Sequence, residues 1–98
     1  MIVNRSSPRI RGQIRVLSQN YKFDTHRALD ALQENAFEPK GYRPVNHGGN
    51  RYVLKAANDC VEILYEVTIS GNVMLVDISE TWRSAIWAAL RFYPDASN

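Results

Sequence analysis

The chain has 98 residues and a net charge of +2, with 45% of its residues hydrophobic and 22% charged. These values predict one globular domain spanning 1–98 and exclude an intrinsically disordered chain. Apolar runs stay short of the roughly 20 residues that a membrane-spanning helix needs, and the first residues lack the basic start and apolar stretch of a secretory signal. We therefore expect a cytoplasmic protein with no membrane partner.

Cysteine and motif content excludes several enzyme classes. Cys60 is the single cysteine, so no internal disulfide or multi-cysteine metal site forms. We expect it to be a small, apolar-tolerant residue at a strand start. The sequence also lacks a Walker glycine loop, a His-Glu-x-x-His pair and a nucleophile elbow. It therefore indicates no metal and no cofactor.

Positive charge is concentrated at the N-terminus. Five of the twelve Lys and Arg residues, and none of the ten acidic residues, lie in residues 1–22, which gives that segment +5 and the remainder −3. This asymmetry indicates contact with nucleic acid or with an acidic partner, or else a solvated helix face. Arg9 and Arg15 are the candidates for RNA contact in this segment.

The N-terminal third predicts two helices. Ile2 and Val3 leave open a short edge strand, and Ser7 followed by Pro8 is typical of a helix N-cap and first position. Four residues then recur at helical spacing and form one apolar stripe: Ile10, Ile14, Leu17 and Tyr21. A second helix is predicted to begin at Asp24 or Thr25 and to run to about Asn35, which makes a helical hairpin.

Residues 38–50 are rich in glycine, proline and asparagine, which predicts a long loop. Lys40, Tyr42, Arg43 and His47 fall in this loop and Arg51 follows it. Such a set can contact phosphates and stack on bases, although an ordinary connector with solvated cations has the same composition.

Residues 51–78 form three runs of β-branched and aromatic residues separated by turn formers, which predicts a three-stranded antiparallel meander. The middle run alternates between an apolar face and a mixed face that carries Glu62 and Glu66. These two carboxylates suit a solvated edge or pairing with Arg and Lys across the sheet. The apolar face is formed by Val61, Ile63, Tyr65, Val67 and Ile69.

A C-terminal helix is predicted from about Thr81 to Tyr93, where Pro94 ends it. Trp82, Ile86 and Trp87 lie on its apolar surface. This surface is either a lid on the core or a partner-binding interface. The predicted fold is therefore α+β, with a helical hairpin packed on a small antiparallel sheet and a helix after it.

Three segments carry a resemblance to a known family: Arg51-Tyr-Val-Leu-Lys55, Val61-Glu-Ile-Leu-Tyr-Glu-Val67 and Val73-Met-Leu-Val-Asp-Ile78. Together with the element order, they resemble the RelE/ParE superfamily of bacterial toxin–antitoxin systems over roughly residues 27 to 78. The resemblance implies a curved antiparallel sheet against a helical hairpin. It implies either cleavage of mRNA in the ribosomal A site without a metal or cofactor, as in the RelE branch, or poisoning of DNA gyrase, as in the ParE branch. In both branches a cognate antitoxin protein neutralises the toxin.

The chain departs from the family pattern at Glu62, where the family often carries an arginine. Arg83 is the nearest match to the basic residue that follows the last strand in the family. A carboxylate at position 62 repels a phosphate, although it can also serve as a base. This departure favours the alternative of a ParE-like toxin or a catalytically inactive member that acts by protein–protein binding. An unrelated α+β adaptor is a third alternative.

Residue chemistry alone permits a metal-independent ribonuclease. Attack by a ribose 2′-hydroxyl needs a base, His47 or Glu62, and an acid, His47 or Tyr65, although core packing suits Tyr65 better. The developing charge needs Arg43, Arg51 or Lys55 nearby. Together with this chemistry, the resemblance to the RelE/ParE superfamily implies a toxin that acts as a ribosome-dependent mRNA endoribonuclease, and we predict this function. The candidate catalytic residues are His47, Arg51 and Glu62, and the candidate RNA-binding residues are Lys40, Arg43, Lys55, Arg9 and Arg15.

Overall fold

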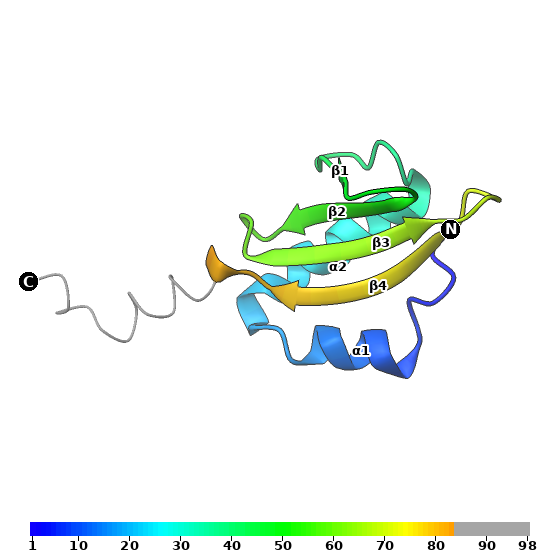
Figure 1. The fold of residues 1–98 in the computed structure, drawn as a ribbon. Coiled ribbons are helices and arrows are strands. Elements are labelled where there is room, and N and C mark those ends of the chain that lie inside the picture. The colour runs from blue at the N-terminus through cyan, green and yellow to red at the C-terminus, as the bar shows by residue number, and fades with distance from the viewer. Residues whose placement is uncertain (84–98) are drawn as a thin grey trace, which may run out of the picture.

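Two helices and a four-stranded antiparallel sheet make up residues 1–83, the part of the chain that the computed structural model describes (Figure 1). The helices are α1 (Pro8–Arg15) and α2 (Gln19–Glu34), and the strands are β1 (Val45–Asn46), β2 (Arg51–Ala56), β3 (Val61–Val67) and β4 (Val73–Glu80). The strands lie in chain order across the sheet. This arrangement confirms the predicted α+β class.

Helix α1 begins where the sequence predicts. The Ser7 side chain accepts a hydrogen bond from the backbone N–H of Ile10 at 3.3 Å, and Pro8 occupies the first turn. Ile10 and Ile14 are buried. The helix ends at Arg15, so Tyr21 belongs to α2.

The predicted start of α2 is wrong. The helix begins at Gln19 with Ser18 at the N-cap position, and Asp24 and Thr25 lie inside it. Ser18 donates its backbone N–H to the Glu80 carboxylate at 3.0 Å. A contact between residues 62 positions apart in sequence thus holds the start of α2. Capping rules consider only neighbouring residues, so they do not reveal such a contact. The helix ends at Glu34, close to the predicted end.

The meander over residues 51–78 is confirmed as β2, β3 and β4. The fourth strand, β1, comes from the segment predicted to be a loop, and it pairs with Tyr52 and Val53. Gly48 and Gly49, both at positive φ, turn the chain between β1 and β2. At the N-terminus, Ile2 forms only an isolated parallel bridge with Val73 rather than a strand.

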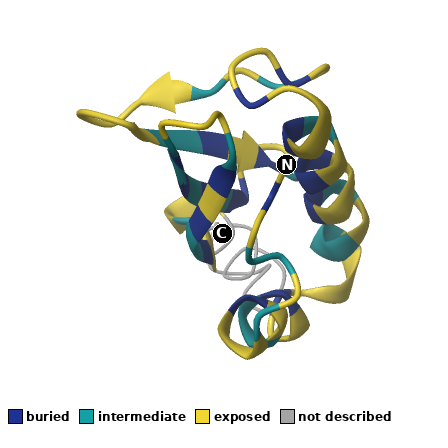
Figure 2. Ribbon diagram, turned by 90° about the vertical axis from the view of Figure 1, so that its right-hand side faces the viewer, coloured by how far each residue is buried: buried dark blue, intermediate teal, exposed yellow. Residues whose placement is uncertain are grey.

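One face of the sheet packs against the helices and forms the core (Figure 2). The alternation predicted for β3 is confirmed from Val61 to Val67. Ile69 was wrongly assigned to this face, because it lies in the turn beyond the strand and is fully exposed. Cys60 is buried and directly precedes β3, next to the predicted strand start.

Side chains from the N-terminal region cover the outer edge of β4. Asn4 exchanges two hydrogen bonds with the Leu75 backbone at 2.8 Å each. Gln13 accepts from the Ile78 N–H at 2.9 Å. These contacts satisfy backbone groups that a bare edge strand leaves open. They confirm that β4 lies beside a helix.

The predicted C-terminal helix falls mostly outside the described residues, which include only Thr81, Trp82 and Arg83 of it. Ile86 and Trp87 lie outside this range. Trp82 is 67% exposed.

Candidate functional site on the open face of the sheet

The sheet face opposite the helices, here called the open face, carries most of the candidate site. Because cross-strand partners lie side by side on one face, the strand register arranges its side chains in three rows. The apolar row is Val45, Val53, Leu64 and Asp77; the polar row is Lys55, Glu62 and Ser79; the ion-pair row is Arg51, Glu66 and Met74. Strands are about 4.8 Å apart, so the apolar row crosses all four strands in about 14 Å.

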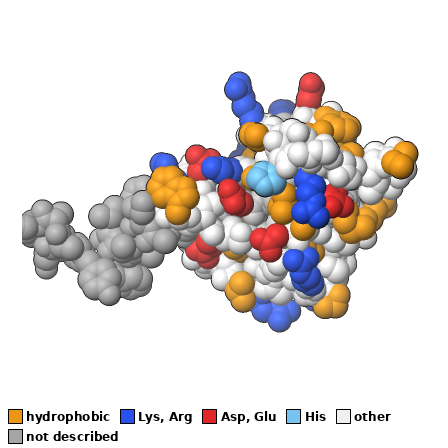
Figure 3. Space-filling model, in the orientation of Figure 1, with side chains coloured by type: hydrophobic (Ala, Val, Ile, Leu, Met, Phe, Trp, Pro, Cys, Tyr) orange, Lys and Arg blue, Asp and Glu red, His pale blue; other side chains and the backbone are white. Residues whose placement is uncertain are grey.

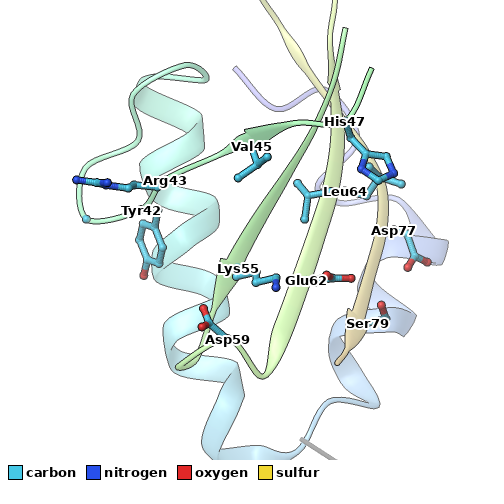
Figure 4. A pocket seen from close by; sticks show the side chains of 12 residues that line it. Tyr42, Arg43, Val45, His47, Lys55, Asp59, Glu62, Leu64, Asp77 and Ser79 are labelled. Atoms are coloured by element: carbon cyan, nitrogen blue, oxygen red, sulfur yellow. The ribbon is translucent and has the colours of Figure 1, made fainter. Parts of the chain in front are cut away.

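A pocket of about 650 Å³ lies over the apolar and polar rows (Figure 4). The loop before β1 and the segment after it complete its wall. The lining residues are Gly41, Tyr42, Arg43, Val45, His47, Val53, Lys55, Asp59, Glu62, Leu64, Asp77 and Ser79.

The pocket is lined by five of the residues that the sequence singled out, among them Tyr42. Arg43 comes from the loop before β1, His47 follows β1, and Lys55 and Glu62 are cross-strand partners on β2 and β3. The His47 backbone N–H donates to the Arg51 carbonyl at 2.8 Å, which anchors the His47 backbone to β2. A cation, a carboxylate and an imidazole therefore line one pocket.

Other predicted site residues lie outside the pocket lining. Arg51 is on the open face, but its Nε lies 2.9 Å from the Glu66 carboxylate. This pair confirms that Glu66 meets a cation across the sheet. Lys40 is exposed in the loop before β1, and Arg15 is exposed at the end of α1. Arg9 reaches the pocket only through Asp77, with 3.8 Å between Arg9 Nη2 and Asp77 Oδ1.

Tyr65 is not available as an acid. Its side chain is fully buried on the helix-facing side, where its hydroxyl donates to the Ala36 carbonyl at 3.0 Å. Its ring stacks on Tyr52 with 5.7 Å between centroids. Burial raises the pKa of Tyr65 far above its usual value. The packing interpretation of Tyr65 is therefore confirmed, which leaves His47 as the acid candidate.

The sequence reasoning missed three polar lining residues: Asp59, Asp77 and Ser79. Asp77 is the only charged residue between Val73 and Ile78, which was the available signal. Counting by twos along β4 from Met74, the partner of Glu66, does not reach it, because the register shifts between Leu64 and Tyr65 and leaves Val76 without a partner. Asp59 sits in a turn whose residues 57–59 all have positive φ.

Asp24 on α2 holds one wall of the pocket. Its carboxylate accepts a hydrogen bond from the Tyr42 hydroxyl at 2.7 Å and another from the Ala57 N–H at 2.7 Å. One side chain thus ties the loop before β1 to the turn between β2 and β3. Burial, followed by the hydrogen bond and the negative charge of Asp24, raises the pKa of Tyr42 to about 12.

The free energy of unfolding is expected to fall as the pH rises from 10 to about 12. A phenol in the unfolded chain loses its proton near pH 10, whereas folded Tyr42 keeps it up to about pH 12, so the unfolded state binds fewer protons in this window. Solvent around the half-buried ring limits the Tyr42 contribution to on the order of 1 kcal/mol. Urea unfolding at successive pH values tests this. Tyr42→Phe should reduce the fall of the free energy of unfolding with pH and leave the part of that fall due to Tyr65. If the fall is the same in Tyr42→Phe as in the wild type, the assignment to Tyr42 is wrong.

Charges of both signs are interspersed on the open face rather than gathered in one basic patch (Figure 3). Two permanent cations, Arg43 and Lys55, and three carboxylates, Asp59, Glu62 and Asp77, line the pocket. A ligand must therefore offer groups that suit both signs. The three carboxylates repel a ligand that carries only negative charge.

Comparison of the chain with protein-family models, with curated proteins and with solved structures gives no match. Within residues 1–83, neither helix is long and apolar enough to cross a membrane.

Proposed function

We propose that the chain is the toxin of a toxin–antitoxin system of the RelE/ParE type, and that it cleaves mRNA on the ribosome with the open-face pocket as its RNA site. The observation that carries this proposal is that His47, Lys55 and Glu62 line one pocket on the open face. The helical pair packed on an antiparallel meander agrees with the fold that the resemblance implies.

The three side chains suit a metal-independent transfer. Glu62 takes the proton from a ribose 2′-hydroxyl, the 2′-oxygen attacks the adjacent phosphorus, and the bond from phosphorus to the 5′-oxygen breaks. His47 gives the leaving 5′-oxygen its proton. Lys55 stabilises the extra negative charge of the pentavalent phosphate. The products are a 2′,3′-cyclic phosphate and a 5′-hydroxyl.

Assignment of Glu62 as the base follows from elimination. His47 and Glu62 are both candidates for the base, and the burial of Tyr65 leaves His47 as the acid. Lys55 is the cross-strand partner of Glu62, so a positive charge lies beside the carboxylate and offsets its repulsion of the phosphate.

A non-nuclease toxin that binds DNA gyrase or another protein is the second candidate. The three carboxylates in the pocket favour it, because each opposes a bound phosphate. The exposed Trp82 offers an aromatic anchor of the kind that protein interfaces use. In both candidates we propose a cognate antitoxin as a partner.

Induction in a bacterial host with transcriptome-wide mapping of RNA 5′ ends tests the proposal. The wild type is expected to produce new cuts within translated codons, and a triple alanine variant at Arg43, His47 and Lys55 is expected to lose them. Alanine at Arg11, Lys22 and His26 is the matched control, because it removes the same residue types from the two helices. Growth arrest without new 5′ ends would support the second candidate instead.

A further inference from the structure

Asp77 ends the apolar row of the open face. Val45, Val53 and Leu64 form a strip across three strands, and Asp77 on β4 is the cross-strand partner of Leu64. All four residues line the pocket (Figure 4). An apolar strip that ends in a hydrogen-bond acceptor suits a planar ring with donors on one edge.

Helix α1 fixes the orientation of the Asp77 carboxylate. Gln13 Nε2 donates to Asp77 Oδ1 at 2.9 Å, while Gln13 Oε1 accepts from the Ile78 N–H at 2.9 Å. Both ends of the Gln13 amide are therefore engaged. Arg9 Nη2 lies 3.8 Å from the same Oδ1. Oδ2 has no hydrogen-bond partner within residues 1–83, and the side chain is 44% exposed.

The other carboxylates of the open face have different surroundings. Glu66 is paired with Arg51 at 2.9 Å. Glu62 lies in the polar row between Lys55 and Ser79. Asp77 is thus the one carboxylate among the described residues of the open face whose cross-strand partner, Leu64, belongs to the apolar strip.

We propose that Asp77 is a specificity-determining residue that recognises guanine in single-stranded RNA, an inference that rests on the proposed function. A carboxylate offers only acceptors. Guanine alone among the four RNA bases presents two adjacent donors, N1–H and N2–H, on its Watson–Crick edge. Adenine and cytosine place an acceptor beside their amino group, and the single donor of uracil lies between two acceptors. The guanine ring lies on Val53 and Leu64, and its two donors meet the Asp77 carboxylate.

Binding of RNA pentanucleotides measures this preference without any need for cleavage. The probes are uridine pentamers with guanosine, inosine or adenosine at the centre, and every 2′-hydroxyl is methylated so that no linkage can be cut. Amide chemical-shift titration of the labelled protein detects millimolar affinities. The wild type is expected to bind the guanosine probe about tenfold or more tightly than the adenosine probe. Inosine, which lacks the N2 amino group, is expected to fall between them.

Asp77→Asn is the decisive variant. Asparagine keeps an oxygen for Gln13 Nε2 but replaces one acceptor with a donor, so the preference is expected to fall below about twofold. Asp77→Ser is a second variant that removes the acceptor pair, in case the amide disturbs the edge of β4. Glu66→Gln removes the same charge from the same face and should keep the preference.

The outcomes separate this inference from the proposed function. Guanine preference that Asp77→Asn removes, without cuts in cells, would support the recognition and reject the nuclease. Cuts in cells with no guanine preference in binding would support the nuclease and reject the recognition of guanine by Asp77. An unchanged preference in Asp77→Asn, equal binding of all probes by the wild type, or no RNA binding would each overturn the role of Asp77.

Discussion

Lys55→Ala is expected to slow RNA cleavage by about 10²- to 10³-fold, because removal of one preorganised group that stabilises a developing negative charge has this cost in other enzymes. Lys55 projects from β2 into the pocket beside its cross-strand partner Glu62. It is also exposed, so its loss should change the free energy of unfolding by no more than about 0.5 kcal/mol. The measurement is the rate at which cuts appear by primer extension on programmed ribosomes.

Arg51→Ala is the matched comparison for Lys55→Ala. Arg51 lies on the same strand and face, four residues away, but it is paired with Glu66 and does not line the pocket. We expect a loss below about tenfold, because its distance from the reacting phosphate weakens its field. Equal losses for the two variants would show that general positive charge, rather than the pocket, supports activity.

Glu62→Gln separates the two roles open to this carboxylate. As the base, Glu62 should cause a loss of about 10²- to 10⁴-fold when it becomes an amide of the same shape. If instead the carboxylate only repels the phosphate, the amide should speed cleavage. A faster Glu62→Gln variant would transfer the role of base to His47.

Local patterns predicted the elements whose ends are fixed by local chemistry. Ser7 and Pro8 begin α1 as expected, and the alternation from Val61 to Val67 correctly identifies the buried face of β3. Such features depend on neighbours in sequence, through a cap or a two-residue period. The start of α2 could not be found in this way, because Ser18 is held by Glu80 from the far end of the sheet.

The sequence predicted which types of residue form the candidate site, but it did not predict how they are arranged in space. Arg51 and Lys55 look alike in sequence, yet the strand register pairs Arg51 with Glu66 and places Lys55 beside Glu62 in the pocket. Asp77 and Met74 share the open face, although they are three residues apart, because the register shifts between Leu64 and Tyr65. The strand register and irregularities of this kind depend on the packing of the whole sheet. The amino-acid composition of the strands does not predict them.

Tyr65→Ala is expected to lower the free energy of unfolding by about 3 to 5 kcal/mol, the range for large aromatic residues removed from a core. Tyr65 is fully buried, and its ring stacks on Tyr52, which in turn meets Phe37 edge-on at 6.0 Å. Domains of this size are stable by only about 5 to 15 kcal/mol. The variant should therefore show a much lower urea midpoint by circular dichroism, or fail to fold at 37 °C.

Tyr65→Phe tests packing against chemistry. It removes only the hydroxyl that donates to the Ala36 carbonyl at 3.0 Å, and the unpaired buried carbonyl should cost about 1 to 3 kcal/mol. Because the ring faces the helices and lies outside the pocket lining, the cleavage rate of the folded variant should match that of the wild type. A large loss of rate in a folded Tyr65→Phe protein would contradict the assignment of His47 as the acid.

The helix-facing side of β3 supplies stability, whereas its open face supplies Glu62 and Leu64 to the pocket. Substitutions on the helix-facing side should therefore change the free energy of unfolding, and substitutions on the open face should change the rate of the proposed RNA cleavage.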